Sequence, residues 1–258
     1  MDLIAALRAN RAAFLLALQF LTRLRVPVAF SPEALRESPR WYPSVGVVVG
    51  LLAGAVYWIV ALRFSPTLAA LAATAAAIMV TGALHEDGLA DLCDGLGGHA
   101  SRDRALAIMR DSRIGTYGTL GLGLMLAARI TALAALPNAA VPFVLIAGHA
   151  ASRASMLWVM ATVRYARDTG AASGVAGGVD SRALQIGLIT AALAAVPLIF
   201  VLPIAAIAMG AVGLVAAHYA IRQRFENRLG GYTGDCLGAV QQFSELGFYL
   251  GTLLMVAA

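Results

Sequence analysis

The residues best suited to chemistry lie in the segment 85–118, which packs six acidic residues and four arginines into 34 positions. Asp87, Asp91 and Asp94 are spaced by four and then three residues, which places their side chains on one face of a helix. Carboxylates this close repel one another unless a cation offsets their charge. Oxygen ligands suit a hard divalent ion, so we expect these three carboxylates to bind Mg²⁺, with Mn²⁺ as the alternative, and Glu86 to assist from the flank.

Groups that could bind phosphate come directly after the acids. We expect Gly97 and Gly98 to end the helix and to leave backbone N–H groups that can face phosphate oxygens. An amphipathic segment follows, and each of its arginines could hold a phosphate through two hydrogen bonds. The candidates are Arg102, Arg104, Arg110 and Arg113. The alternatives are a solvated polar face for the acids and contact with lipid headgroups for the arginines. The two groups together favour phosphoryl or nucleotidyl transfer.

Such a transfer also needs a group that accepts the proton of an attacking hydroxyl, and a carboxylate not used by the metal can do this. Three aspartates stay open for this role: Asp91, Asp111 and Asp235. Asp235 follows the glycine-rich segment 230–234. It could also be a metal ligand, or it could serve only as an acid at the start of the last helix.

The composition indicates a helical membrane protein. Of 258 residues, 60% are hydrophobic and 13% are charged, and several runs of about 18–22 residues are long enough to cross a bilayer as helices. These runs are continuous rather than alternating, which argues against a β-barrel. The expected fold class is all-α, a polytopic bundle of about seven transmembrane helices. The expected spans are Ser44–Leu62, Thr67–Leu84, Thr119–Leu136, Val141–Val163, Ala183–Phe200, Ile204–Ile221 and Leu237–Ala257.

The N-terminal segment has an apolar run over residues 12–21 after two early arginines. It looks like a signal peptide, but no small-residue cleavage site follows, so we expect a retained amphipathic or re-entrant helix that does not span. With the N-terminus inside, 16 of the 19 arginines fall on the inner side, as the positive-inside rule favours.

This orientation predicts one transmembrane catalytic domain over residues 1–258, with an active-site segment at 85–118 that faces the cytoplasm. The net charge of +5 reflects orientation in the membrane rather than nucleic-acid binding, so we expect the lipid bilayer and no nucleic acid among the partners. The number of subunits stays open, a homo-oligomer included.

Two arginines, Arg129 and Arg153, lie inside expected spans, where a charge costs at least about 2.5–3.5 kcal/mol unless it faces a partner or a cavity. His149 shares a helix face with Arg153, and Glu245 in the last span is a natural partner for either arginine. Two interpretations stay open. One is a buried ion pair that joins helices, and the other is a polar cavity in which Arg153 contacts a phosphate.

Two stretches carry a resemblance to a known family. HEDGLADLCDGL at residues 85–96 and MRDSRIGTYG at residues 109–118 resemble the signatures of cobalamin synthases, the adenosylcobinamide-GDP ribazoletransferases. Weaker similarities lie at residues 20–24, 41–46 and 233–239, in the order of the family. The resemblance therefore covers nearly the whole chain.

The resemblance implies a Mg²⁺-dependent, multi-pass enzyme of the cell inner membrane that completes the nucleotide loop of cobalamin. Adenosylcobinamide-GDP would be joined to α-ribazole or α-ribazole 5′-phosphate, giving adenosylcobalamin or its 5′-phosphate and releasing GMP. A ribose hydroxyl would attack one phosphorus of a diphosphate, which agrees with the metal and phosphate sites expected above.

Two other functions compete with this one. A CDP-alcohol phosphotransferase also displaces a nucleotide with closely spaced aspartates, but Asp91 and Leu92 stand where its motif has alanine and arginine. A secondary transporter, from a different class, would explain charges inside spans but not an acid cluster at the membrane edge. An enzyme would release GMP in detergent, with no sealed vesicle needed.

Overall fold

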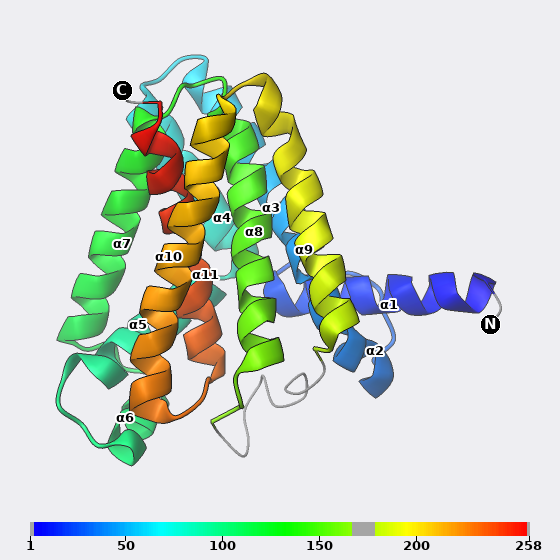
Figure 1. Cartoon of the computed structure of the whole chain (residues 1–258), viewed down its shortest axis with the longest axis vertical. Coiled ribbons are helices and arrows are strands. Elements are labelled where there is room, and N and C mark those ends of the chain that lie inside the picture. The colour runs from blue at the N-terminus through cyan, green and yellow to red at the C-terminus, as the bar shows by residue number, and fades with distance from the viewer. Residues whose placement is uncertain (1–2, 167–178, 257–258) are drawn as a thin grey trace.

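The computed structural model describes residues 3–166 and 179–256, and the β-structure among them is an isolated bridge between Tyr165 and Tyr232. Figure 1 shows a bundle in which the long helices run side by side while α1 lies across their direction. The elements are α1 (Leu3–Leu21), α2 (Pro32–Glu37), the 3-10 helix η1 (Ser38–Trp41), α3 (Tyr42–Ala61), α4 (Pro66–Thr81), α5 (Leu84–Gly97), α6 (Arg102–Ile108), α7 (Thr116–Ala135), α8 (Val141–Thr162), α9 (Ser181–Ala195), the 3-10 helix η3 (Val196–Phe200), α10 (Ile204–Leu229) and α11 (Gly234–Leu254).

The expected all-α, polytopic membrane fold is confirmed. Within the described residues, six helical stretches are long and apolar enough to cross a membrane, and the bent pair α4 and α5 would add a seventh. The six are Ile4–Leu21, Pro32–Ala61, Thr116–Ala135, Val141–Thr162, Ser181–Phe200 and Ile204–Leu229. By composition α1 qualifies as a span, yet it lies across the bundle in Figure 1, as a helix in the membrane interface would.

The expected span Thr67–Leu84 is divided by a sharp bend. α4 begins after the N-cap Ser65 with Pro66 in its first turn, and it ends at Gly82, whose φ of 68° is left-handed. Ala83 is left-handed as well, with a φ of 60°, and α5 leaves at 91° to α4. A left-handed alanine is unfavourable by itself, so the surrounding packing must hold the bend.

The last expected span, Leu237–Ala257, corresponds to α11, which is too polar to be counted with the six. α11 instead forms the inside of the bundle, where it packs against α5, α7, α8 and α10. A Cβ atom added to Gly213 of α10 would overlap the carbonyl oxygen of Gly247 in α11. The two helices therefore meet backbone to backbone at this point.

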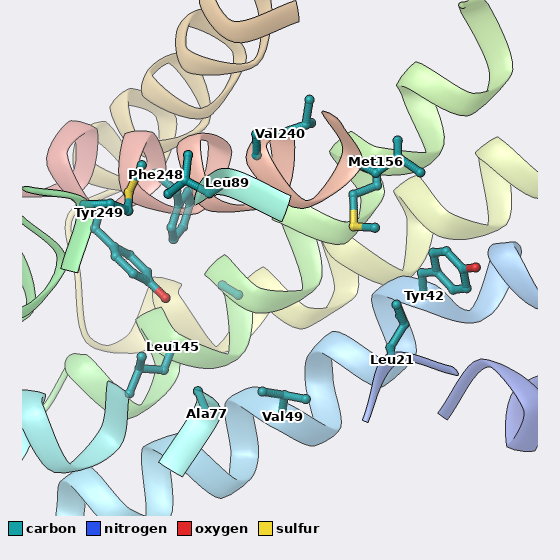
Figure 2. Packing of buried hydrophobic residues seen from close by; sticks show 14 of the residues in the cluster. Leu21, Tyr42, Val49, Ala77, Leu89, Leu145, Met156, Val240, Phe248 and Tyr249 are labelled. Atoms are coloured by element: carbon teal, nitrogen blue, oxygen red, sulfur yellow. The ribbon is translucent and has the colours of Figure 1, made fainter. Parts of the chain in front are cut away.

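Buried apolar side chains from several helices form the core, part of which Figure 2 shows from close by. Val49 of α3, Leu145 of α8 and Tyr249 of α11 are each at most 2% exposed. Gly46 brings α3 close to α8, because a Cβ atom there would overlap the carbonyl group of His149. Small residues at such contacts let membrane helices approach closely, and they explain the glycines within the apolar runs.

Candidate active site

The end of α11 that carries Asp235 lies against α5 with no side chain between them. A Cβ atom added to Gly88 would lie 2.9 Å from the Cα atom of Asp235. One added to Gly238 would lie 3.0 Å from the carbonyl oxygen of His85. One glycine on each helix therefore sets the distance between α5 and α11, and both place Asp235 beside the acidic face of α5.

Asp87 and Asp235 line one cavity of about 130 Å³, which we call the acidic cavity. Its other lining residues are Phe20, Leu21, Tyr42, Leu84, His85, Gly88, Met156, Gly234, Leu237 and Gly238. Asp91 lies one turn beyond Asp87 on the same side of α5 and is partly exposed. The structure therefore brings Asp87 and Asp235 to one cavity, with Asp91 one helical turn away on α5.

The other two predicted metal ligands are engaged elsewhere. Glu86 is 6% exposed and accepts a hydrogen bond from Nε2 of Gln242 at 2.9 Å, and Nη1 of Arg129 lies 3.5 Å from it. The Asp94 carboxylate accepts hydrogen bonds from two backbone N–H groups at the start of α7, at 2.7 and 2.8 Å. Both carboxylates therefore connect α5 to neighbouring helices.

The four carboxylates expected to bind one ion are consequently not gathered together. Across residues 3–166 and 179–256, no three carboxylate, imidazole or thiolate side chains are close enough to hold a metal ion between them. The oxygen donors at the acidic cavity still suit Mg²⁺, because Mg²⁺ is usually bound through one or two carboxylates and keeps water or substrate phosphates as its remaining ligands.

Asp111, one candidate for the general base, forms an exposed ion pair with Arg113 in the turn between α6 and α7. Nη2 of Arg113 lies 2.6 Å from Oδ2 of Asp111, and Nε of Arg113 donates to the same carboxylate. These hydrogen bonds lower the pKa of Asp111 to about 2. A carboxylate with so low a pKa is a weak proton acceptor.

The four arginines of segment 85–118 divide into two kinds. Arg102 joins α6 to the end of α10, because its Nε donates to the carbonyl oxygen of Leu229 at 2.9 Å. Arg113 is paired with Asp111. The guanidinium groups of Arg104 and Arg110 are exposed and donate no hydrogen bond in the part of the chain that the structure describes. They are the arginines best available to a phosphate.

α5 ends at Gly97, with Gly98 as its cap, as expected from the sequence. A Cβ atom on Gly97 would overlap the ring of Tyr117, so Gly97 makes room for a side chain of α7 rather than for a ligand. Gly98 has open space where a side chain would be, and its carbonyl oxygen accepts a hydrogen bond from Arg228 at 3.1 Å. Only Gly98 keeps the open approach that phosphate binding needs.

Arg153, another predicted phosphate ligand, is 1% exposed and lies in a network of ion pairs inside the bundle. Glu245 holds this network: its Oε1 is 3.1 Å from Nη2 of Arg129, and its Oε2 is 2.8 Å from Nδ1 of His149. Arg153 donates to the backbone oxygen of His149 at 3.0 Å and does not line the acidic cavity. Arg153 therefore lies inside the buried network and away from the acidic cavity.

Two contributors to the site were missed by the sequence analysis. Gln242 accepts from Arg129 at 2.5 Å and donates to Glu86, so it ties α5 and α7 to α11. His85 lines the acidic cavity although it is only 2% exposed. The signals for both residues are visible in retrospect, since adjacent glutamines are unusual in a span and His85 opens the acidic motif.

A bundle of apolar helices that holds an acidic cavity beside a buried ionic network is typical of an integral membrane enzyme. The family can be named from comparison with known proteins. The chain belongs to the cobalamin-5-phosphate synthase family, whose model matches residues 13–253.

Curated relatives cover nearly the full chain. A protein of Leptothrix cholodnii is 42% identical over 260 residues, which include 96% of this chain and 97% of the relative. A protein of Ralstonia nicotianae is 39% identical over 251 residues and 95% of each chain. One of Polaromonas sp. is 36% identical over 274 residues, covering 92% of this chain and 95% of the relative. All three are named adenosylcobinamide-GDP ribazoletransferase. No solved structure matches the chain.

Proposed function

We propose that this protein joins adenosylcobinamide-GDP to α-ribazole or α-ribazole 5′-phosphate. In this reaction a ribose hydroxyl oxygen bonds to the phosphorus on the cobinamide side of the diphosphate, and the bond from that phosphorus to GMP breaks. The products are GMP and adenosylcobalamin or its 5′-phosphate. The observation that carries the proposal is the pair Asp87 and Asp235 at one cavity, in a chain whose relatives carry the name of this activity.

Asp235 is our choice for the group that accepts the hydroxyl proton, because it lines the acidic cavity whereas Asp111 is held in an ion pair outside it. Asp91, one turn from Asp87, is the second candidate. Arg104 and Arg110 have unengaged guanidinium groups that can bind the diphosphate in pairs of hydrogen bonds.

Magnesium is part of the proposal, with Mn²⁺ as the alternative. Asp87 and Asp91, one helical turn apart, would hold the ion from α5. Bound there, Mg²⁺ would neutralise the diphosphate and the departing GMP. Glu86 and Asp94 would then act by positioning α5, since their carboxylates already have protein partners.

The proposed location is the cell inner membrane, with the acidic cavity open to the cytoplasm. α6, the turn at Gly230 and the start of α9 lie at the same end of the bundle in Figure 1. The arginines of these segments cluster at that end, which the positive-inside rule assigns to the cytoplasm.

The test is GMP release by the detergent-purified protein supplied with adenosylcobinamide-GDP, α-ribazole 5′-phosphate and Mg²⁺. We expect GMP and a cobalamin product in equal amounts, with loss of both in Asp87→Asn, in Asp235→Asn and in EDTA. Asp103→Asn is the matched control, because Asp103 is an exposed acid on α6 that pairs with the neighbouring Arg102 and does not line the acidic cavity. If folded wild-type protein releases no GMP, the proposal is wrong and transport in sealed vesicles becomes the next assay.

A further inference from the structure

We propose that the acidic cavity is the subsite for the acceptor: it takes the flat bicyclic base of α-ribazole against its apolar wall and turns the ribose toward Asp87 and Asp235. The corrinoid donor stays outside the cavity and presents only its diphosphate to the carboxylates. This inference rests on the proposed function and adds to it which of the two substrates the cavity selects.

The apolar wall comes from four separate elements. Phe20 and Leu21 end α1, Tyr42 begins α3, Met156 lies on α8 and Leu237 on α11. Figure 2 shows Leu21, Tyr42 and Met156 grouped at one end of the buried cluster. Two aromatic rings and flexible methionine and leucine side chains suit a flat aromatic ligand, because such groups make stacking and sulfur contacts with a ring.

Asp87 and Asp235 line the same cavity as these apolar side chains. Ionised carboxylates accept hydrogen bonds, and a ribose offers hydroxyl donors. The lining therefore combines apolar and acidic groups, as a nucleoside with a hydrophobic base combines an apolar ring with hydroxyl groups.

The size of the cavity separates the two substrates. The acidic cavity has a volume of about 130 Å³. Pockets that bury a drug-sized ligand measure about 300–1,000 Å³, so this cavity is on the scale of one small ring system, and a corrin macrocycle with its amide side chains needs a far larger site. The donor is thus excluded from the cavity by its bulk, and only its linear diphosphate can reach the carboxylates.

The test compares two methionines on α8, each 4% exposed, of which Met156 lines the cavity and Met160 does not. In Met156→Ala we expect the KM for α-ribazole to rise about tenfold, the size of effect that a few lost methylene contacts produce, while the KM for adenosylcobinamide-GDP stays within twofold. In Met160→Ala both KM values should stay within twofold. Equal changes in the two variants, or a rise confined to the donor, would overturn the inference.

Binding without turnover separates this inference from the proposed function. The resting protein in detergent, titrated with α-ribazole alone, should bind it, and Met156→Ala should raise the Kd about tenfold. If α-ribazole binds in this way but no GMP is ever released, the subsite stands and the proposed reaction fails. If GMP is released but Met156→Ala leaves the Kd for α-ribazole unchanged, the proposed subsite is wrong.

A second variant, at a less buried position, keeps the test valid if Met156→Ala does not fold. Phe20 is partly exposed at the end of α1, so Phe20→Ala is expected to fold and again to raise the Kd for α-ribazole. An unchanged Kd in folded Phe20→Ala and folded Met156→Ala together would exclude the base from this wall.

Discussion

Gly88 and Asp235 are in backbone contact: a Cβ atom on Gly88 would lie 2.9 Å from the Cα atom of Asp235. Because α5 and α11 touch here, the two carboxylates Asp87 and Asp235 reach the same cavity. The geometry of the site therefore depends on an absent side chain as much as on those present.

Gly88→Ala should push α11 away from α5 and displace Asp235 from Asp87. Since a misplacement of about 1 Å can reduce a rate about 100-fold, we expect GMP release to fall at least tenfold while the protein still folds in the membrane. Gly123→Ala is the control, because Gly123 on α7 is exposed and a Cβ atom there meets nothing within 4 Å. Equal activity of the two variants would show that the contact does not position Asp235.

Asp94 should matter for the fold and not for the metal. In Asp94→Ala the two backbone N–H groups at the start of α7 lose their acceptor, so we expect the free energy of unfolding to fall by about 1–2 kcal/mol. In Asp94→Asn we expect the Mg²⁺ concentration for half-maximal GMP release to stay within twofold. In Asp87→Asn that concentration should rise about tenfold or more, if activity remains measurable. A similar rise in Asp94→Asn would restore Asp94 as a metal ligand.

Glu245 should be essential for stability. In Glu245→Gln the buried network loses the carboxylate that pairs with Arg129 and His149. Removing one charge from a buried pair costs about 3–5 kcal/mol. Glu226→Gln breaks a partly exposed pair with Arg222 on α10, so it should cost less than about 1 kcal/mol. Thermal unfolding in detergent measures both. Equal midpoints would mean that the buried network does not hold the bundle together.

Replacing Asp111 should not change the pH dependence of the reaction. Its carboxyl pKa is lowered from 3.8 to about 2 in the folded protein, so any stability from its pair with Arg113 is present above about pH 4 and is lost as the pH falls toward about 2. The group is therefore ionised throughout the working range. GMP release by Asp111→Asn, followed from about pH 5 to 9, should have the wild-type profile. A lost acid limb in this variant would make Asp111 the general base.

The sequence predicts the acidic site in part, and the residues show why. Helical spacing correctly places Asp87 and Asp91 on one face of α5, because that relationship is local. The same spacing adds Asp94, but its carboxylate binds the start of α7, whose position depends on contacts far away in the chain. Glu86 likewise turns to Gln242, a partner 156 residues away that no local pattern indicates.

The sequence predicts the long helices of the bundle better than it predicts the bend between α4 and α5. Long apolar runs give the all-α fold, since length and composition alone decide whether a helix can cross a membrane. Hydropathy does not predict the bend between α4 and α5. Ala83 has a left-handed backbone conformation there, which only the packing of neighbouring elements can hold. α11 is placed correctly as a helix, but its polar residues identify an interior position that hydropathy does not measure.

The glycine contacts of α11 also determine which positions of the chain tolerate substitution. Bulky changes at Phe200, which is 81% exposed on the outside of the bundle, should be neutral. One added methyl group at Gly88, Gly213 or Gly238 would shift α11 and with it Asp235. A complete mutational scan should therefore find its most intolerant positions among residues that have no side chain at all, and these positions should trace the path of α11 from the interior of the bundle to the acidic cavity.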